Sequence, residues 1–500
     1  MLLAVAGSAR AQAVQFAPAE GGEVIVDPEL AAQTPPAAEQ PETTIAAPSE
    51  QSADVRLVLR SRVGVDLEWQ DPREDVVEAT QLMLIEARVR RSEQLSFTVG
   101  VRAVHKTLTR ARSTPDADPV RFELEAAPTA MHADVGVTDN VHTRVGYQGV
   151  HLGRFDVLGA SDVLSRYDLR SGPMVMPETS EIAQPAISAD WDILQGLAVR
   201  GIYVPFFAPH MIYAFEGDYA LQPQRQADTE VGFEEIDDIP LTPTAEALAN
   251  AWRSALSRSA QARLTEGAFA AFAPDPNLGS PQAGLRVTAH GPAGEVALTA
   301  ATALEKLPTL NFNAAGIPRL HYGRFGLLSL DAATGVGPVQ LGVEVAYTSD
   351  RAVFSTTEDD LPQTRESDIL HTAVRGELIE GDEWLVAVEA SCATMLADPP
   401  DDQDWLFTVE RRFQLAAIGF IGYSITDIDL RLELGGGVLV GPTYLITPRV
   451  ELRLWDQLYG EVGAYLIGGK GGSRLSDPSA TLGSLYDDID QVLFGLRWLI

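Results

Sequence analysis

The chain has 500 residues, 45% of them hydrophobic, and a formal net charge of −33. This negative charge argues against a nucleic-acid partner, because it would repel a phosphate backbone. It has no uncharged apolar run of about eighteen residues or more, so transmembrane helices are excluded and any membrane role must rest on strands. Its one cysteine, Cys392, leaves no disulfide framework and no cysteine-based metal site.

The N-terminal residues 1–13 are typical of the end of a signal peptide. A short apolar run is followed by small residues at Ala9, Ala11 and Ala13, which predicts cleavage after Ala11 or Ala13. The basic segment that usually opens such a peptide is missing, and a flexible Ala-rich terminus is the alternative. Residues 14–52 are rich in Ala, Pro, Glu and Gln and too poor in large apolar groups to fold alone. We expect a disordered periplasmic arm there.

Strict alternation of apolar and polar residues begins at about residue 54. Asp54, Arg56, Arg60, Arg62, Asp66 and Glu68 share one parity, and the other carries Val55, Leu57, Leu59, Val63, Val65, Leu67 and Trp69. A strand with this period presents an apolar face and a charged face, and it is long enough to cross a bilayer at the usual tilt. The pattern favours lipid on one side and water on the other.

Similar segments recur to the end of the chain, including separate strands at 119–127 and 130–138. Together they predict an all-β fold, an antiparallel transmembrane barrel of about 16–18 strands over residues 53–500. The last segment alternates up to the final residue, with Phe494, Trp498 and Ile500 on its apolar face. We interpret it as the closing strand and as the signal that the barrel-assembly machinery reads, although Phe is the usual last residue of that signal.

Two irregular regions interrupt the strands, at 153–183 and at 206–281. The second is too long for a structureless loop in a compact domain. Within it, residues 243–265 have a helical pattern, with Pro243 in the first turn and Leu248, Trp252 and Leu256 on one face. This insertion is expected to fold inward as a plug or to cover the mouth as a lid, and an exposed decoration is the alternative.

The strand and loop from residue 146 resemble a known family. Gly146, Gln148, Gly153, Asp156, Asp162, Asp168 and Arg170 match the strand-to-loop motif of a family of uncharacterised Gram-negative outer-membrane barrels, distantly related to alginate-export porins. Leu152 replaces a Trp of the motif, Tyr147 an Arg, and Ser165 with Arg166 an Asn-Pro pair. The resemblance implies a passive or export-linked channel.

The same residues have a physical interpretation of their own. Alternation points Arg144, Gly146 and Gln148 toward the lumen, and the chain is expected to leave the strand through Gly153. The charges of the returning loop can then pin it against the inner wall through charge-assisted hydrogen bonds, and the residues are Arg154, Asp156, Asp162, Arg166, Asp168 and Arg170. The loop either is only braced in this way or also contacts the solute.

Arginines recur on the expected inner face, and they are Arg56, Arg60, Arg62, Arg88, Arg90, Arg102, Arg144 and Arg200. In a narrowed lumen they would favour anions. Interleaved carboxylates, such as Asp54, Asp66 and Glu86, could equally neutralise them in a structural ladder. The two readings stay open at this point.

The sequence contains neither the Gly-x-Ser-x-Gly motif of serine hydrolases nor the His-Glu-x-x-His motif of zinc proteases, and it has no phosphate-binding glycine loop. We therefore expect no enzyme, no cofactor and no metal. We predict a monomeric channel or export porin of the bacterial outer membrane that passes a polar, possibly anionic, solute or polymer, with residues 206–281 controlling access. The competing hypothesis is a plugged, non-conducting barrel that serves as a scaffold or as the partner of an inner-membrane exporter. Outer-membrane lipid and lipopolysaccharide would surround either one.

Overall fold

The structure of the protein is a computed structural model that describes most of the predicted barrel. The described residues are 52–66, 77–109, 120–155, 158–168, 181–211, 280–306, 309–312, 318–356, 362–380, 383–396, 413–439, 443–469 and 490–499. The predicted signal peptide, residues 14–51 of the predicted periplasmic arm, the 243–265 helix and Ile500 lie outside them, while Ser52, the last residue of that arm, is the first of the strand that follows. No helix in the described part is long and apolar enough to cross a membrane.

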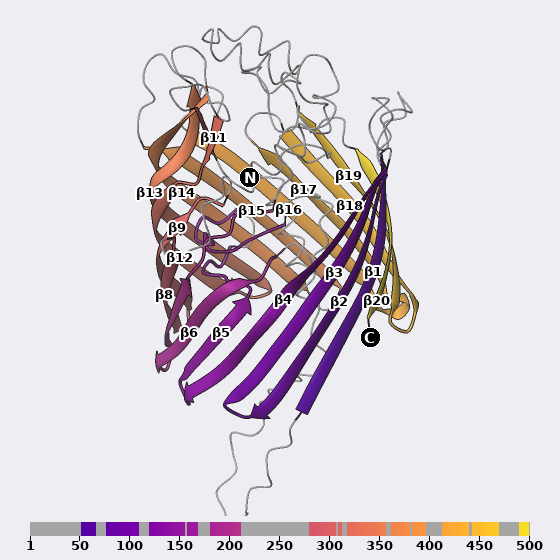
Figure 1. Ribbon diagram of the computed structural model, residues 1–500, viewed down its shortest axis with the longest axis horizontal. Coiled ribbons are helices and arrows are strands. Elements are labelled where there is room, and N and C mark those ends of the chain that lie inside the picture. Colours follow the sequence, from indigo (N-terminus) through magenta and orange to yellow (C-terminus); the bar gives the residue numbers. More distant parts are fainter. Residues whose placement is uncertain are drawn as a thin grey trace, which may run out of the picture.

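Eighteen strands form one antiparallel sheet that closes on itself through β1 and β20 (Figure 1), within the predicted range of 16–18. The barrel strands are β1 (Ser52–Asp66), β2 (Val77–Ser92), β3 (Leu95–Thr109), β4 (Val120–Thr138), β5 (Val141–Gln148), β6 (Gln184–Leu194), β7 (Leu197–Val204), β8 (Gln282–Gly291), β9 (Gly294–Leu304), β12 (Arg324–Val336), β13 (Val339–Thr356), β14 (Pro362–Glu380), β15 (Trp384–Met395), β16 (Phe413–Ile425), β17 (Leu430–Leu439), β18 (Thr443–Trp455), β19 (Leu458–Gly469) and β20 (Gln491–Leu499). A separate hairpin, β10 (Thr309–Phe312) and β11 (Pro318–His321), stands between β9 and β12.

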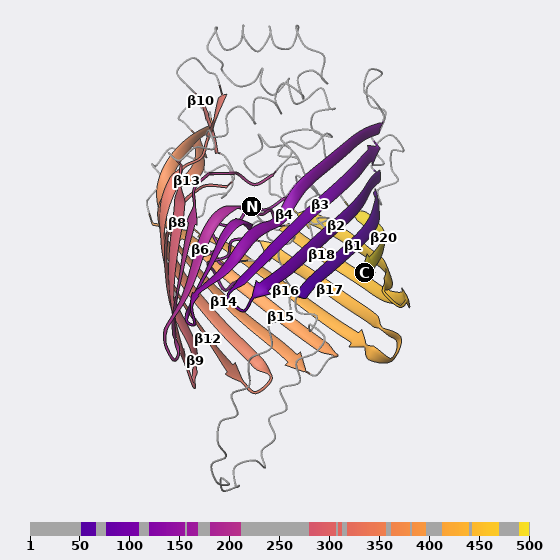
Figure 2. The same ribbon diagram turned by 60° about the horizontal axis from the view of Figure 1, so that its bottom comes forward.

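The two ends of the barrel differ in their connections. Short turns, such as those after β2, β4 and β6, lie at the lower end in Figure 1, and Figure 2 brings this end forward. Ser52 pairs with Arg90 and Leu499 pairs with Val58, so the first and last strands both have their outer ends there. Barrels of the bacterial outer membrane have short turns on the periplasmic side and longer loops outside. The short-turn end is therefore the periplasmic end.

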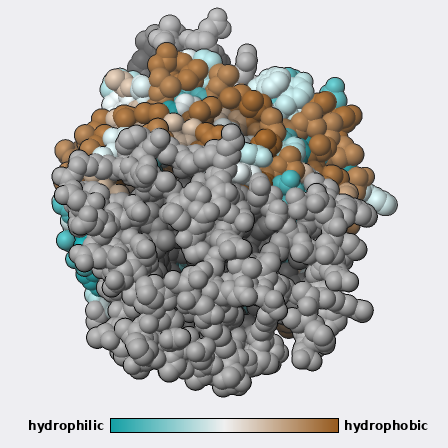
Figure 3. Space-filling model, turned by 90° about the horizontal axis from the view of Figure 1, so that it is seen from above, coloured by the Kyte–Doolittle hydropathy of each residue, from teal (hydrophilic) through white to brown (hydrophobic). Residues whose placement is uncertain are grey.

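The two faces of the sheet have opposite character. Figure 3 shows hydrophobic side chains gathered on the outside of the barrel where it is in view, and many are well exposed, among them Val55, Met83, Phe97, Val145, Leu298, Leu330, Val345, Leu434 and Trp498. The opposite parity is buried and largely polar, as with Arg60, Arg102 and Glu344. An apolar outer belt around a polar interior belongs to a barrel that spans lipid. The chain is an outer-membrane β-barrel.

Two sequence-based boundaries are wrong. The separate strands predicted at 119–127 and 130–138 are one strand, β4, with a bulge where Val101 of β3 pairs with Pro128 while Gly100 pairs with Ala130. Thr129 is the extra residue, and Pro128 has no N–H to donate, so both break the alternation without ending the strand. In addition, β5 ends at Gln148 rather than at Gly153.

Charged side chains form ion pairs across the junction of β1 and β20, where the barrel closes. Glu461 of β19 accepts hydrogen bonds from Arg60 Nη2 at 2.8 Å and Arg62 Nε at 3.0 Å, both on β1. It reaches them across β20 at Gly495, where an added Cβ would lie 2.4 Å from the Glu461 Oε1 atom. Arg449 of β18 binds the same carboxylate. We call these four charged residues the seam cluster.

Candidate functional site

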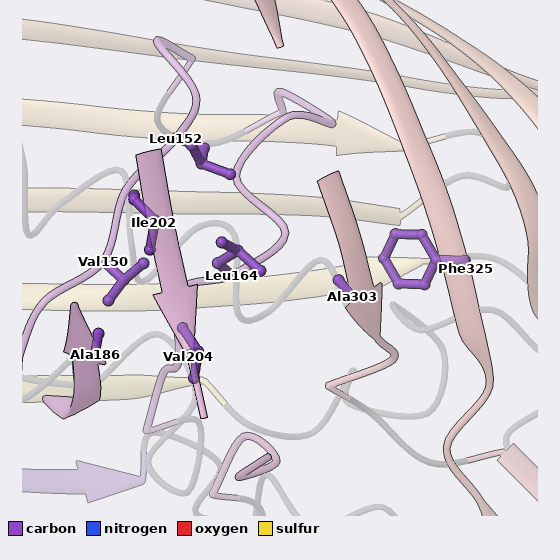
Figure 4. Close-up of a cluster of buried hydrophobic side chains, with 8 residues drawn as sticks. All are labelled: Val150, Leu152, Leu164, Ala186, Ile202, Val204, Ala303 and Phe325. Atoms are coloured by element: carbon purple, nitrogen blue, oxygen red, sulfur yellow. The ribbon is translucent and has the colours of Figure 1, made fainter. Parts of the chain in front are cut away.

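The chain turns into the barrel after β5 instead of crossing its rim. We call residues 149–155 and 158–168 the inward loop. Its apolar side chains pack on the inner wall of the barrel in the cluster shown in Figure 4, formed by Val150, Leu152, Leu164, Ala186, Ile202, Val204, Ala303 and Phe325. The last five belong to β6, β7, β9 and β12. Leu164 and Val204 are fully buried, so burial of apolar surface holds the base of the loop against this side of the wall.

The tip of the inward loop is bound by carboxylates from strands farther around the barrel. Glu389 of β15 accepts the Leu158 N–H at 2.5 Å. Glu344 of β13 accepts the Ala160 N–H at 2.6 Å and the Ser161 hydroxyl, also at 2.6 Å. Hydrogen bonds to ionised acceptors are roughly twice as strong as neutral ones. The loop is thus fixed at its base and at its tip, and it occupies part of the lumen.

A charged network braces the inward loop internally. The His151 ring lies 3.2 Å from the Asp162 carboxylate through Nδ1 and 3.0 Å from the Glu181 carboxylate through Nε2. Burial opposes the charged ring, but hydrogen bonds to Asp162 and Glu181 outweigh it and raise the pKa of His151 to about 11. The same contacts hold the pKa of Asp162 below its ordinary value despite burial. At neutral pH His151 is therefore an imidazolium that bonds two carboxylates.

Ser165 joins this network, so the loop contains a serine, a histidine and an aspartate in contact. The Ser165 hydroxyl lies 2.7 and 2.6 Å from the two Asp162 oxygens and is 1% exposed. A serine nucleophile needs a neutral imidazole as its base and access for the substrate. A charged His151 and a buried Ser165 provide neither, so the chemistry of this arrangement is structural.

The segment after β7 supports the far end of the inward loop. His210 Nδ1 accepts the Tyr167 N–H at 3.0 Å, and burial lowers the pKa of His210, so its ring is neutral. Arg166 Nε donates to the Pro209 carbonyl at 2.7 Å. Lys306 lies beside this segment, with Nζ 5.4 Å from the centre of the Phe207 ring, and its buried amino group has no hydrogen-bond partner in the part of the chain that the structure describes.

The residues of the strand-to-loop motif have different surroundings. Gly146 has a φ of +134°, and an added Cβ would lie 2.2 Å from the Met131 carbonyl oxygen, so only glycine fits. Gln148 is buried and donates to the Ala186 carbonyl at 2.9 Å. Gly153 packs against Ser161 and Asp162. An added Cβ would lie 2.6 Å from the Ser161 hydroxyl oxygen, so a larger residue would displace that hydroxyl.

The charged members of the motif were expected to pin the loop to the wall. Arg154 bonds Glu295 of β9 at 3.0 Å, and Asp168 lies 3.8 Å from Arg102 of β3. Asp162 instead acts within the loop. Asp156 and Arg170 lie outside the described residues. The carboxylates that bind the loop tip, Glu344 and Glu389, were missed in the sequence, where they look like ordinary inward polar positions.

The eight predicted lumen arginines separate into three groups. Arg60 and Arg62 are buried in the seam cluster, and Arg102 bonds Glu125 at 3.3 Å and also lies near Asp168. Arg56 is exposed on β1. The remaining four line one cavity of about 290 Å³ at the periplasmic end, and they are Arg88, Arg90, Arg144 and Arg200. The structure therefore brings four of the eight predicted arginines together in one cavity.

No protein-family model and no curated protein matches the chain. Among solved structures it is similar to OccAB1 of Acinetobacter baumannii (TM-score 0.48, 8% identity, covering 90% of this chain and 96% of that one). It is also similar to the outer-membrane protein opdK of Pseudomonas aeruginosa (TM-score 0.45, 10% identity, 90% and 98% covered) and to Salmonella typhi OmpF, solved with daunomycin (TM-score 0.42, 8% identity, 90% and 98% covered).

Proposed function

We propose that the chain is an outer-membrane channel for polar, negatively charged solutes, in which the inward loop narrows the passage. The observation that carries this proposal is the position of the loop, which is packed on one side of the lumen at Leu164 and bound farther around the wall at Glu344. A loop fixed at two points inside a barrel sets the width of the passage without depending on a moving lid.

The distribution of charge supports the anionic part of the proposal. Arg88 and Arg90 point into the lumen, and among the described residues no carboxylate forms an ion pair with either of them. Uncompensated guanidinium groups along a passage raise the local concentration of anions and repel cations. Arg60 and Arg62 do not add to this uncompensated charge, because Glu461 binds both.

The test is a planar-bilayer recording of the purified, refolded full chain. We expect discrete openings and, under a salt gradient, a reversal potential of the sign that anion preference requires. Cation preference would contradict the anionic part. A silent membrane, with the fold verified by circular dichroism and heat-modifiable migration, would overturn the channel and favour the plugged scaffold that partners an inner-membrane exporter.

A further inference from the structure

The arginine cavity, which we define by Arg88, Arg90, Arg144 and Arg200, has the composition of a binding site. It lies on the inner wall of β2 to β7, and residues 149–151 of the inward loop also line it. Its volume is about 290 Å³, which suits a small ion rather than a polymer. Because it opens inside the barrel, membrane lipid has no access to it.

The four guanidinium groups are not equally engaged. Arg144 Nε bonds Asp134 and Arg200 Nε bonds Asp190, each at 2.5 Å. The only other carboxylate among the described lining residues is Glu93, which is exposed in the turn after β2. Arg88 and Arg90 therefore provide the positive charge that no carboxylate of the described lining residues neutralises.

The arginines are the donors that remain for an anion in this cavity. Ser96 and Ser188 also line it, but their hydroxyls already donate to Asp134 at 3.4 Å and to Gln148 at 3.1 Å. The planar donor fork of arginine matches the oxygen spacing of phosphate and carboxylate groups. An ion with several oxygens can accept hydrogen bonds from both arginines of β2, which lie on the same face two residues apart.

We infer that the arginine cavity binds a small oxyanion of the sulfate or phosphate class on its way through the periplasmic end of the barrel. This inference deepens the proposed channel function, for which it supplies a stopping point near the exit. Arg88 and Arg90 are the residues that confer binding, while Arg144 and Arg200 are already held by their carboxylates.

The experiment is titration calorimetry of the refolded full chain in detergent with sodium sulfate and with inorganic phosphate at low ionic strength. We expect one binding event, and the double variant Arg88→Gln, Arg90→Gln should bind at least about tenfold more weakly, because charge-assisted bonds are lost at both positions. The matched control is Arg56→Gln, which removes an exposed arginine of β1 that does not line the cavity and should leave the affinity unchanged.

Equal affinity in the double variant, or no binding by the wild-type chain, would overturn the inference. An equal loss in Arg56→Gln would also overturn it, because it would reveal only a general attraction to positive charge. The bilayer recording tests the channel proposal independently of the binding measurement. Sulfate binding with a silent bilayer would leave the site without a channel, and a conducting barrel without binding would leave the channel without the site.

Discussion

At the residue scale, Lys306 carries a buried amino group beside the Phe207 ring. Its Nζ atom has no hydrogen-bond partner among the described residues, and burial, with a smaller contribution from the nearby Arg166, lowers its pKa from 10.5 to about 7. Between pH values of about 7 and 10.5, the Lys306 amino group is protonated in the unfolded chain and neutral in the folded chain. The free energy of unfolding therefore rises with pH from about 7 toward 10.5, as far as Lys306 determines it.

We predict that Lys306→Met increases the free energy of unfolding at pH 7 by roughly 1–3 kcal/mol, since an apolar side chain replaces a buried polar group without a partner. The gain should shrink toward pH 10. Denaturant unfolding in detergent at both pH values measures it. Lys306→Arg is the matched comparison, because arginine stays charged and should destabilise at both. A Lys306→Met variant with the wild-type pH slope would show that another group causes that slope.

At the scale of elements, the inward loop depends on two strands that are remote from it in the sequence. Glu344 and Glu389 accept its backbone N–H groups, and among the described residues of the tip Phe155 and Leu158 are buried apolar side chains. A net contribution of about 1.5–3 kcal/mol is usual for a hydrogen bond to a charged group. The position of the tip is therefore sensitive to the ionisation of these two carboxylates.

The corresponding prediction concerns Glu344→Gln combined with Glu389→Gln. Each amide oxygen can still accept the backbone N–H group, but the bond loses the assistance of the negative charge, so the tip should separate from the wall more often. Hydrogen–deuterium exchange at residues 158–161 should become faster, while exchange in the neighbouring strands stays the same. Glu377→Gln is the control, because Glu377 also faces inward but bonds Arg375 instead. Unchanged exchange in the double variant would refute the role of the carboxylates.

The strands and their faces could be predicted from the sequence, whereas the partners across the barrel could not. Alternation identifies Val145 as lipid-facing and Arg144 as inward because each depends only on parity along one strand. The bond between Arg60 and Glu461 joins residues 401 positions apart, and no local pattern contains that information. For the same reason Arg60 and Arg62 could not be distinguished from Arg88 in the sequence. Of these three residues, Arg88 alone lines the arginine cavity.

At the scale of the whole molecule, the seam cluster connects the beginning of the barrel to its end. Arg60, Arg62 and Arg449 converge on Glu461, and all four side chains are at most 5% exposed. Removing one partner of a buried ion pair typically costs 3–5 kcal/mol, because the remaining charges stay desolvated. The cluster is thus a major determinant of whether the closed barrel persists.

We predict that Glu461→Gln lowers the free energy of unfolding by about 3–5 kcal/mol and makes the barrel lose its compact, heat-modifiable form at a lower temperature. Urea unfolding in lipid vesicles measures the first effect and gel migration the second. Asp429→Asn is the control, since its 2.7 Å pair with Arg453 is exposed and should contribute nothing measurable. Equal stability of both variants would mean that strand pairing alone closes the barrel.

The seam cluster also limits where a cargo molecule can leave. A wall that opens between its first and last strands would offer a sideways exit into the bilayer, but here the opening would separate Arg60 and Arg62 from Glu461, and all three side chains are buried. For the proposed channel, the seam cluster therefore opposes release of a lipophilic solute through the wall at this junction. It favours passage along the barrel axis, between the water of the periplasm and the water outside the cell.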